Sequence, residues 1–533
     1  MPEAGAEIGT IPAAVRAAAA FGDRLGLVDG DRRVPYAELV ADVRRTAAAY
    51  LAHGVGPGDR VAVWAPNGLE WLLAALGAQY VGAVLVPVNT RYRGQEAADV
   101  VARTRARVLV VGQGFLGADQ LGMLRAAALE AEPGAAAGAG PVPGLPDLET
   151  VVTVGDADPP PATVPWQRFL ADAAHADPAR AEKLADAVTP DDVADILFTS
   201  GTTGRSKGAV STHRQTLGAA RAWSGLTAVT ADDRYLVVSP FFHSFGSKAG
   251  YLVCLLTGAT AFPVAVFDTG TVLDALERER ITIMPGAPTL YQSLLDDPSL
   301  PGRDLGSLRL AVTGAATVPQ SLVERMGTEL GIDTVLTGYG LTEAPVVTLC
   351  VPGDDPHTVA TTSGRAAPGV ELRADENGEI LVRGPVMRGY LDDPEATAAA
   401  IDADGWLHTG DVGVVDERGY LRITDRIKDM YTVGGFNVYP AEVEKLLAAH
   451  PTVREAAVIG VPDERQGEVG RAYVIPRTGT APDAEELIAY CRERLANYKV
   501  PRSVAVVADL PRNAGGKVVK PELRAAYAAS EGS

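Results

Sequence analysis

Residues 195–210 read Asp-Ile-Leu-Phe-Thr-Ser-Gly-Thr-Thr-Gly-Arg-Ser-Lys-Gly-Ala-Val. The apolar run Ile196–Phe198 predicts a buried strand, and the residues after it combine glycines, hydroxyl side chains and Lys207. Glycines let the backbone approach an anion closely, while N–H groups, hydroxyls and an ammonium can bind it. The stretch therefore predicts a phosphate-binding loop, with a flexible surface turn as the alternative. It differs from the common nucleotide loop, because Ser206 stands where that motif requires glycine and Lys207 is followed by another glycine.

Strands and helices alternate along the chain before this loop. Residues 60–64 and 83–88 predict strands, and residues 71–80 predict a helix between them. Such alternation is typical of a parallel, doubly wound α/β sheet. Because 533 residues are too many for one hydrophobic core, we expect two or more domains.

The composition is that of a globular enzyme with an acidic balance. Lys and Arg number 48 against 67 Asp and Glu, which gives a net charge of −19 and disfavours nucleic acid or an anionic membrane as partner. Cys254, Cys350 and Cys491 are widely spaced, as expected in a reducing cytoplasm and not at a metal site. We find no membrane span and no signal peptide in the sequence. The oligomeric state, monomer or homodimer, stays open.

The segment Thr199–Gly208 resembles the signature loop of the adenylate-forming superfamily, which includes acyl-CoA synthetases, peptide synthetase adenylation domains and luciferases. One departure is Ser206, where the family usually has proline. The resemblance extends in family order over residues 10–525. It implies a large N-terminal domain, residues 1–427, with doubly wound α/β sheets and a small barrel-like region, followed by a small mobile α+β domain, residues 428–533. It also implies ATP, Mg²⁺ and coenzyme A as cofactor and co-substrates. The phosphate-binding residues implied are Thr199, Ser200, Gly201, Thr202, Thr203, Gly204 and Lys207.

Two later turns complete the expected nucleotide site. Residues 308–316 predict a strand that runs into a Gly-Ala turn, and the resemblance implies that Gly314, Ala315 and Ala316 contact adenine. Residues 334–343 supply an aromatic ring, a hydroxyl and a carboxylate close together. By resemblance, Tyr339 stacks on adenine beside Gly340, Thr342 holds the α-phosphate and Glu343 is a ligand of Mg²⁺, a cation that prefers oxygen. Asp411 and Arg426 match the residues that contact the ribose.

The acid substrate is expected beside an aromatic cluster. Residues 235–246 predict a strand that ends in Phe241, Phe242, His243 and Phe245. A lone histidine among aromatic rings is often structural, but the resemblance implies a gate between the ATP and acyl pockets, with a catalytic role for His243. Lys248 either extends to solvent or meets a substrate oxygen far from the reacting carboxylate. The expected acyl pocket comprises Phe242, His243, Ser247, Lys248 and Gly338.

The C-terminal region carries the remaining candidates. Lys428 falls at the family's hinge, and Gly434 and Gly435 would open a passage for the pantetheine thiol. Lys517 lies on a glycine-rich tip and matches the catalytic lysine, while Lys520 matches a position that is usually basic and exposed. A lysine on such a tip can be presented to the cleft of another domain.

The resemblance implies an ATP-dependent acid–CoA ligase. The expected reaction is adenylation of a carboxylate with release of pyrophosphate, followed by transfer to coenzyme A. Three stretches, in residues 241–250, 311–319 and 425–431, are closest to actinobacterial ligases of a steroid-ring propionate, whereas Ser247, Gly338 and residues 345–347 depart from them. Aromatic or medium-chain acids are further possibilities. The alternative activity is a diazotase that activates nitrite and transfers it to an aromatic amine. A non-catalytic ATP-binding module is disfavoured, because Lys517, Glu343 and Thr342 are all present.

Overall fold

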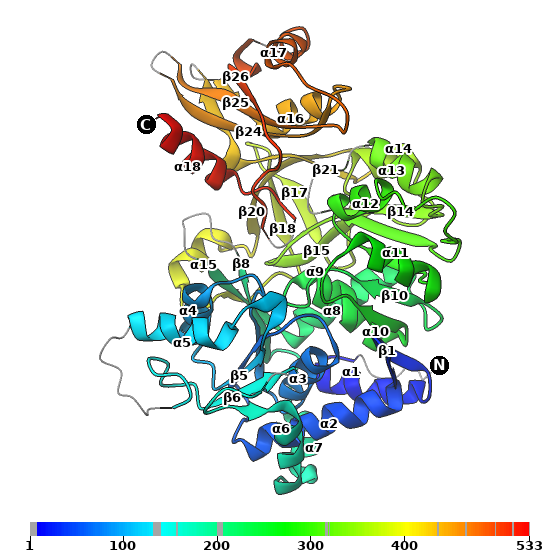
Figure 1. The fold of residues 1–533 in the computed structure, drawn as a ribbon, viewed down its shortest axis with the longest axis vertical. Helices are drawn as coiled ribbons and strands as arrows, with labels where there is room; N and C mark the ends of the chain where they lie inside the picture. Colours follow the sequence, from blue (N-terminus) through cyan, green and yellow to red (C-terminus); the bar gives the residue numbers. More distant parts are fainter. Residues whose placement is uncertain are drawn as a thin grey trace.

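The structure is a computed structural model that describes residues 8–131, 140–155, 158–199, 206–314, 318, 320–433, 436–463, 466–495, 497–513 and 516–531. These residues form four β-sheets and a set of helices around them (Figure 1). The helices of the large N-terminal part are α1 (Ile11–Ala18), α2 (Tyr36–Ala52), α3 (Leu69–Tyr80), α4 (Gly94–Thr104), α5 (Gln120–Ala131), α6 (Trp166–Ala171), α7 (Pro178–Ala187), α8 (His213–Leu226), α9 (Ser244–Gly246), α10 (Leu252–Thr257), α11 (Thr269–Arg278), α12 (Pro288–Leu295), α13 (Gln320–Thr328), α14 (Pro356–Thr361) and α15 (Pro394–Ala400).

One sheet contains the strand that precedes the glycine-rich loop. Its strand order is β19 (Gly389–Tyr390), β9 (Lys207–Thr212), β8 (Val193–Thr199), β4 (Val84–Pro87), β3 (Arg60–Trp64), β5 (Val108–Gly112), β6 (Thr150–Val154) and β7 (Val164–Pro165). Strands β8, β4, β3, β5, β6 and β7 are parallel, as predicted. Strands β9 and β19 are antiparallel additions, so the glycine-rich loop connects a β-hairpin.

Both faces of this sheet are buried. Val61 and Val63 of β3 pack in one hydrophobic cluster with α2 and α3. Ala62 and Trp64, which point to the opposite face, pack in a second cluster with α4 and α5. Alternate side chains of a strand point to opposite faces, so the continuous apolar run in β3 is explained by helices that cover the sheet on both sides.

A second sheet brings the other candidate residues to one edge. Its strand order is β16 (Arg365–Ala366), β15 (Ala344–Leu349), β14 (Thr334–Leu341), β13 (Leu310–Gly314), β12 (Ile283–Pro285), β10 (Arg234–Val237), β11 (Thr260–Pro263), β1 (Leu25–Asp29) and β2 (Arg32–Pro35). The neighbouring strands β14, β13, β12 and β10 are parallel. Their carboxyl ends therefore lie at the same edge, where ligands bind in open α/β sheets.

The last part of the chain forms two smaller sheets. An antiparallel sheet of β17 (Glu371–Ala374), β18 (Glu379–Arg383), β20 (Leu407–Val415) and β21 (Leu421–Arg426) stands where a barrel-like region was expected. Beyond it, β23 (Phe436–Val438), β22 (Tyr431–Val433), β25 (Gly467–Pro476), β24 (Val453–Asp463) and β26 (Ser503–Val506) pack with α16 (Pro440–Ala448), α17 (Ala484–Arg492) and α18 (Lys520–Glu531). This C-terminal unit has its own hydrophobic cluster, from Tyr431 to Leu523, and lies at one end of the long axis (Figure 1). The fold class is as predicted, while the boundary at residue 428 stays a prediction.

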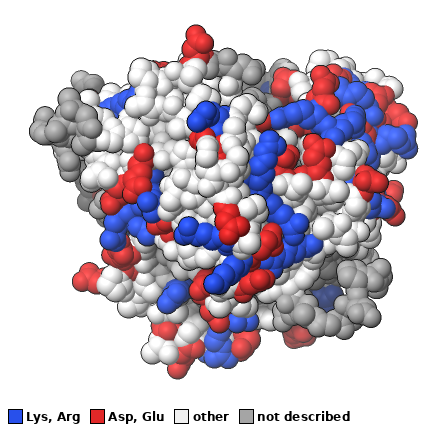
Figure 2. All heavy atoms as spheres, turned by 90° about the horizontal axis from the view of Figure 1, so that it is seen from below, with Lys and Arg blue, Asp and Glu red and all other residues white. Residues whose placement is uncertain are grey.

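Lysines and arginines are interspersed with acidic residues on the face in Figure 2, so the acidic excess is not concentrated there. Among the described residues, every helix is too short or too polar to cross a bilayer. All three cysteines are buried and free.

Candidate active site

The glycine-rich loop rises from the β8–β9 hairpin. Thr199 and Lys207 are paired in the hairpin register, and the Thr199 hydroxyl donates to the Lys207 carbonyl at 3.4 Å. Arg103 of α4 donates to the Ser206 carbonyl at 2.7 Å, which ties the end of the loop to the helix layer. Ser200, Gly201, Thr202, Thr203 and Gly204 lie outside the described residues, so their phosphate-binding role stays a prediction.

The expected adenine and ribose residues meet although they are far apart in sequence. Tyr339, near the carboxyl end of β14, donates a hydrogen bond of 2.6 Å from its hydroxyl to Asp411 on β20. The backbone of Arg426 is paired with that of Asp411 across β20 and β21. The side chain of Arg426 lies outside the described part of the chain, as do Ala315 and Ala316.

Strand spacing explains the glycines of this edge. A Cβ on Gly314 would lie 2.5 Å from the Gly338 carbonyl oxygen, and one on Gly338 would lie 2.5 Å from Leu349. A Cβ on Gly340 would lie 2.2 Å from the Pro345 carbonyl oxygen. At Gly314 and Gly340 the close atoms belong to the backbone, so the β13–β14–β15 arrangement already requires glycine at these two positions, whatever the ligand. At Gly338 the close atom is the end of the Leu349 side chain, which a small rotation would move.

Glu379 on β18 holds the turn that carries Asp411. Its carboxylate accepts hydrogen bonds from the Gly410 N–H and from His408 Nδ1, both at 2.9 Å. The Thr409 hydroxyl donates to the neighbouring Ile380 carbonyl at 2.7 Å. Glu379 was not predicted, because no local motif links it to a turn about thirty residues later.

Thr342 and Glu343 follow directly after β14. The Glu343 carboxylate accepts a hydrogen bond of 2.8 Å from the Tyr390 hydroxyl, and the Lys207 ammonium lies 5.0 Å from the centroid of the Tyr390 ring. Burial and the nearby Glu343 carboxylate raise the pKa of Tyr390 far above its ordinary value, so this phenol is protonated and donates. Tyr390 was not among the predicted site residues.

The residues around Glu343 fit Mg²⁺ only as part of a nucleotide complex. The described residues contain no cluster of three or more His, Cys, Asp or Glu side chains that could hold a metal alone. Mg²⁺ is commonly bound by one or two carboxylates together with substrate phosphates and water. A single oriented carboxylate next to the hairpin that carries the candidate phosphate-binding loop is consistent with that mode.

The aromatic cluster expected to form the gate follows β10. His243 caps the short helix α9: its Nδ1 accepts the Phe245 N–H at 3.2 Å. The imidazole keeps contact with solvent, yet the surrounding protein lowers its pKa below the ordinary value, so it is neutral at pH 7. Phe241 is buried against Trp71 and Tyr251, with ring centroids 5.2 and 5.1 Å away, whereas Phe242 stays partly exposed.

Lys248 is buried in an ion pair. It lies in a π-helical turn (Ser247–Tyr251), only 2% exposed, with its ammonium 3.0 Å from the Asp195 carboxylate. The ammonium also donates to the Ser211 hydroxyl at 3.0 Å, and the Thr216 hydroxyl donates to Asp195 at 2.6 Å. The alternative in which Lys248 extends to solvent is therefore wrong. Its contact with substrate stays a prediction, as do the pocket roles of Ser247, which is 4% exposed, and Gly338.

The glycine-rich C-terminal tip is a hairpin that touches the N-terminal part. Asn513 fixes the backbone of Lys517, because its N–H donates to the Lys517 carbonyl and its side chain accepts the Lys517 N–H. A Cβ on Gly516 would lie 3.3 Å from the Thr289 hydroxyl, so the tip lies against the start of α12. Since α12 follows β12, the Lys517 hairpin lies at the edge where β10, β12 and β13 end.

Arg512 and Lys520 anchor this hairpin to the C-terminal unit. The Arg512 guanidinium donates to the Gly516 carbonyl at 3.0 Å and to Glu455 at 2.6 Å. Lys520, at the start of α18, forms an ion pair of 2.8 Å with Glu444 and is only 12% exposed, in contrast to the exposed position expected from the family. The side chain of Lys428 and all of Gly434 and Gly435 lie outside the described part, so the hinge and passage stay predictions.

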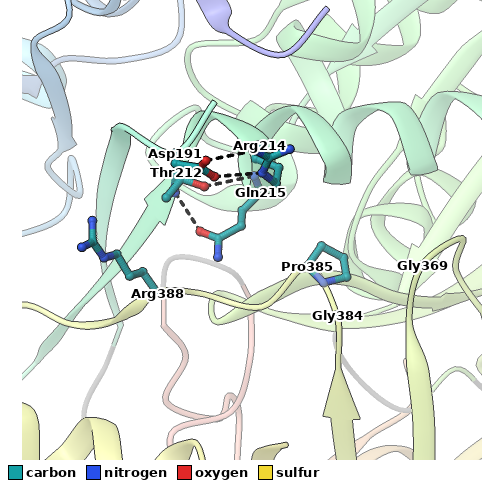
Figure 3. Close-up of a pocket in the computed structure, with 8 residues that line it drawn as sticks. All are labelled: Asp191, Thr212, Arg214, Gln215, Gly369, Gly384, Pro385 and Arg388. Carbon is teal, nitrogen blue, oxygen red and sulfur yellow. Dashed lines mark hydrogen bonds and ion pairs between the residues drawn. The ribbon is translucent and has the colours of Figure 1, made fainter. Parts of the chain in front are cut away.

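A cavity of about 490 Å³ lies at the opposite end of β9 from the glycine-rich loop. Arg214 and Asp191 form an ion pair in this cavity, and the Arg388 side chain extends away from that pair (Figure 3). Its polar groups do not converge on one point, and none of the predicted site residues lines it. It is lined by Asp191, Thr212, Arg214, Gln215, Gly369, Gly384, Pro385 and Arg388.

Comparison with known proteins defines the class of this arrangement. Residues 15–391 match the AMP-binding enzyme family, and residues 442–517 match the AMP-binding enzyme C-terminal domain. The chain belongs to the AMP-binding enzymes, and the predicted acyl-CoA synthetase branch of the adenylate-forming superfamily is confirmed by its relatives.

Two curated relatives share the same name. The chain is 56% identical over 521 residues to a 3-[(3aS,4S,7aS)-7a-methyl-1,5-dioxo-octahydro-1H-inden-4-yl]propanoyl:CoA ligase of Rhodococcus jostii, which covers 97% of this chain and 98% of the relative. It is 55% identical over 522 residues to the ligase of the same name from Mycobacterium tuberculosis, and this match covers 97% of this chain and 99% of the relative. Among solved structures, ATP-bound MatB from Rhodopseudomonas palustris matches with a TM-score of 0.82 and 31% identity, over 96% of this chain and 99% of that one.

Proposed function

We propose that the protein activates a propionate side chain on a fused bicyclic ketone with ATP and transfers the acyl group to coenzyme A. The supporting observation is 56% and 55% identity, over nearly the whole chain, to two ligases named for that substrate. The departures at Ser247 and Gly338 concern the acyl pocket, so the exact acid is the part of the proposal that needs the most direct test. A cytoplasmic location and the absence of a nucleic-acid partner belong to the same proposal.

The first step joins two anions, and the proposed roles follow from that. A carboxylate oxygen of the acid attacks the α-phosphorus of ATP, and the bond to pyrophosphate breaks. Lys517, on a hairpin that lies against α12, would contribute the positive charge between the carboxylate and the α-phosphate. Thr342 would hold the α-phosphate, and Lys207 with the loop from Thr199 to Gly204 would bind the remaining phosphates. Mg²⁺, when bound through Glu343 and the phosphates, would reduce the negative charge of the triphosphate.

The nucleoside would be held by the pair already formed between β14 and β20. Tyr339 offers a ring for adenine beside Gly314, Ala315, Ala316 and Gly340. The Asp411 carboxylate, with Arg426 beside it, would accept hydrogen bonds from the ribose hydroxyls. The Tyr339 hydroxyl donates to Asp411 in the structure and so fixes the carboxylate in advance. His243 and Phe242 would close the passage to the acyl pocket.

In the second step the thiol sulphur of coenzyme A attacks the acyl carbonyl and AMP leaves. Rotation of the C-terminal unit about Lys428 would withdraw Lys517 and bring Gly434 and Gly435 to the site. The Lys517 hairpin forms one rigid piece with Arg512 and Glu455, which suits movement as a unit.

A pyrophosphate-release screen tests this proposal. The acids are a bicyclic keto-propionate, an aromatic acid and a medium-chain fatty acid, each with and without coenzyme A, with the thioester identified by mass. We expect the bicyclic acid to give thioester and AMP. Lys517→Ala should lower adenylation by about 10²-fold or more, as for loss of a charge-stabilising group. AMP release that ignores coenzyme A but requires nitrite and an arylamine would establish the diazotase alternative instead.

A further inference from the structure

Tyr390 lies between two oppositely charged groups of the proposed ATP site. Its hydroxyl donates to a Glu343 carboxylate oxygen at 2.8 Å, and the Lys207 ammonium lies 5.0 Å from the centre of its ring. The same side chain therefore contacts the candidate metal ligand with its edge and the candidate phosphate-binding lysine with its face. Neither contact is expected from the loop motif alone.

The backbone of Tyr390 is fixed to both partners. Strand β19 pairs with β9, where Tyr390 lies opposite Ala209, and the Leu391 N–H donates to the Gly208 carbonyl at 2.8 Å. On the other side, the Met387 N–H donates to the Glu343 carbonyl at 2.6 Å. A movement of the β8–β9 hairpin or of the segment after β14 would thus be transmitted to this residue.

The ring also keeps two useful charges apart. An ammonium and a carboxylate that contact the same side chain attract each other, and a direct ion pair between Lys207 and Glu343 would reduce the charge that each offers to ATP and its metal. An aromatic face attracts a cation without neutralising it, and a phenol hydroxyl orients a carboxylate while leaving it charged. Metal-binding carboxylates are commonly oriented by such hydrogen bonds.

We propose that Tyr390 is a positioning residue for the triphosphate end of the ATP site. Its hydroxyl directs Glu343 toward the metal, and its ring holds Lys207 near the phosphates and prevents direct pairing of the two. This inference rests on the proposed function, because it assumes that Glu343 and Lys207 act on the ATP–metal complex.

The test compares Tyr390→Phe with Tyr420→Phe. Tyr420 is a matched control away from the site: its hydroxyl donates to Asp354 at 2.5 Å, and Arg365 and Arg418 lie 5.0 and 4.8 Å from its ring centroid. The readout is ATP binding by calorimetry over a series of Mg²⁺ concentrations, without any acid substrate. We expect Tyr390→Phe to raise the Mg²⁺ concentration for half-maximal enhancement of binding by about 10-fold or more, as for other groups that orient a metal ligand. ATP binding without Mg²⁺ should be unchanged.

Two further variants separate the possible failures. Tyr390→Leu removes the ring as well and should also weaken ATP binding in Mg²⁺-free buffer, because Lys207 loses its support. Glu343→Gln should show at least the Mg²⁺ shift of Tyr390→Phe. If Glu343→Gln shifts the Mg²⁺ dependence and Tyr390→Phe behaves like Tyr420→Phe, the inference is wrong and the proposed function stands. If neither variant shifts it, the metal role of Glu343 is wrong and the inference falls with it.

Discussion

Replacing Lys248 by methionine should destabilise the N-terminal part of the protein. The substitution leaves the Asp195 carboxylate, whose side chain is 3% exposed, without the ammonium 3.0 Å away. Asp195 would keep the hydrogen bond from Thr216, but its other oxygen accepts no hydrogen bond within the described residues. Removing one partner of a buried ion pair typically costs about 3–5 kcal/mol, because a buried charge remains uncompensated.

This loss is large enough to measure by thermal unfolding. A unit of roughly 420 residues unfolds with an entropy of about 0.9 kcal/mol/K, so a loss of about 3–5 kcal/mol lowers the melting temperature by about 3–6 °C. The double variant Lys248→Met with Asp195→Leu should recover most of the difference, since both charges are then absent. Lys520→Met is the control: its pair with Glu444 is more exposed, so we expect a smaller shift.

The same experiment decides between two roles of Lys248. If Lys248→Met melts within about 1 °C of the wild type, the ion-pair argument is refuted. A raised KM for the acid in that stable variant would then favour the predicted contact with a substrate oxygen.

Three other changes probe the hinge, the tip and a buried histidine. Lys428→Pro should spare pyrophosphate release and block thioester formation, because proline fixes φ at the expected pivot; equal loss of both steps would contradict the hinge. Arg512→Gln should lower adenylation about 10-fold, because it removes one charged donor that orients the hairpin of Lys517. The loss should be smaller than for Lys517→Ala, since Lys517 itself remains. Unchanged pyrophosphate release would argue that Arg512 does not orient the hairpin. Burial lowers the pKa of His213 to about 4. The unfolded chain therefore binds a proton that the folded chain does not, and stability should fall as the pH is lowered from about 6.5 to 4, by up to about 1.4 kcal/mol per pH unit. His213→Asn should remove this component from a urea titration series, whereas a slope equal to that of the wild type would contradict it.

The sequence predicted the parts of the fold that depend on local pattern. The apolar strand before the loop, the parallel strands of residues 60–64 and 83–88 and the strand before the aromatic cluster follow from periodicity. Because parallel strands end at one edge, the carboxyl ends of β10, β13 and β14 lie on the same side of the sheet. The β8–β9 hairpin was missed, because Lys207 and Gly208, the first residues of β9, were treated as part of the loop.

Long-range contacts account for the interactions that were not predicted. Tyr390 reaches Glu343 across 47 positions, and Lys248 pairs with Asp195 across 53 positions of sequence. Neither spacing has a local signature, since each contact is created when separate strands and turns pack together. Glu379 belongs to the same group, because its link to Gly410 depends on the pairing of β18 with β20.

The burial of every cysteine has a practical consequence for observing the proposed domain movement. Burial raises the pKa of all three thiols: far above the ordinary value for Cys254, to about 11 for Cys491, and above the ordinary value for Cys350. These thiols therefore resist alkylation at neutral pH. A cysteine introduced on the surface, for example by Ser299→Cys, could therefore be labelled selectively while the three native cysteines stay in place. A second at Arg492 of α17 would allow a pair of fluorescent dyes to report the separation of the two units during turnover, in an otherwise unmodified enzyme.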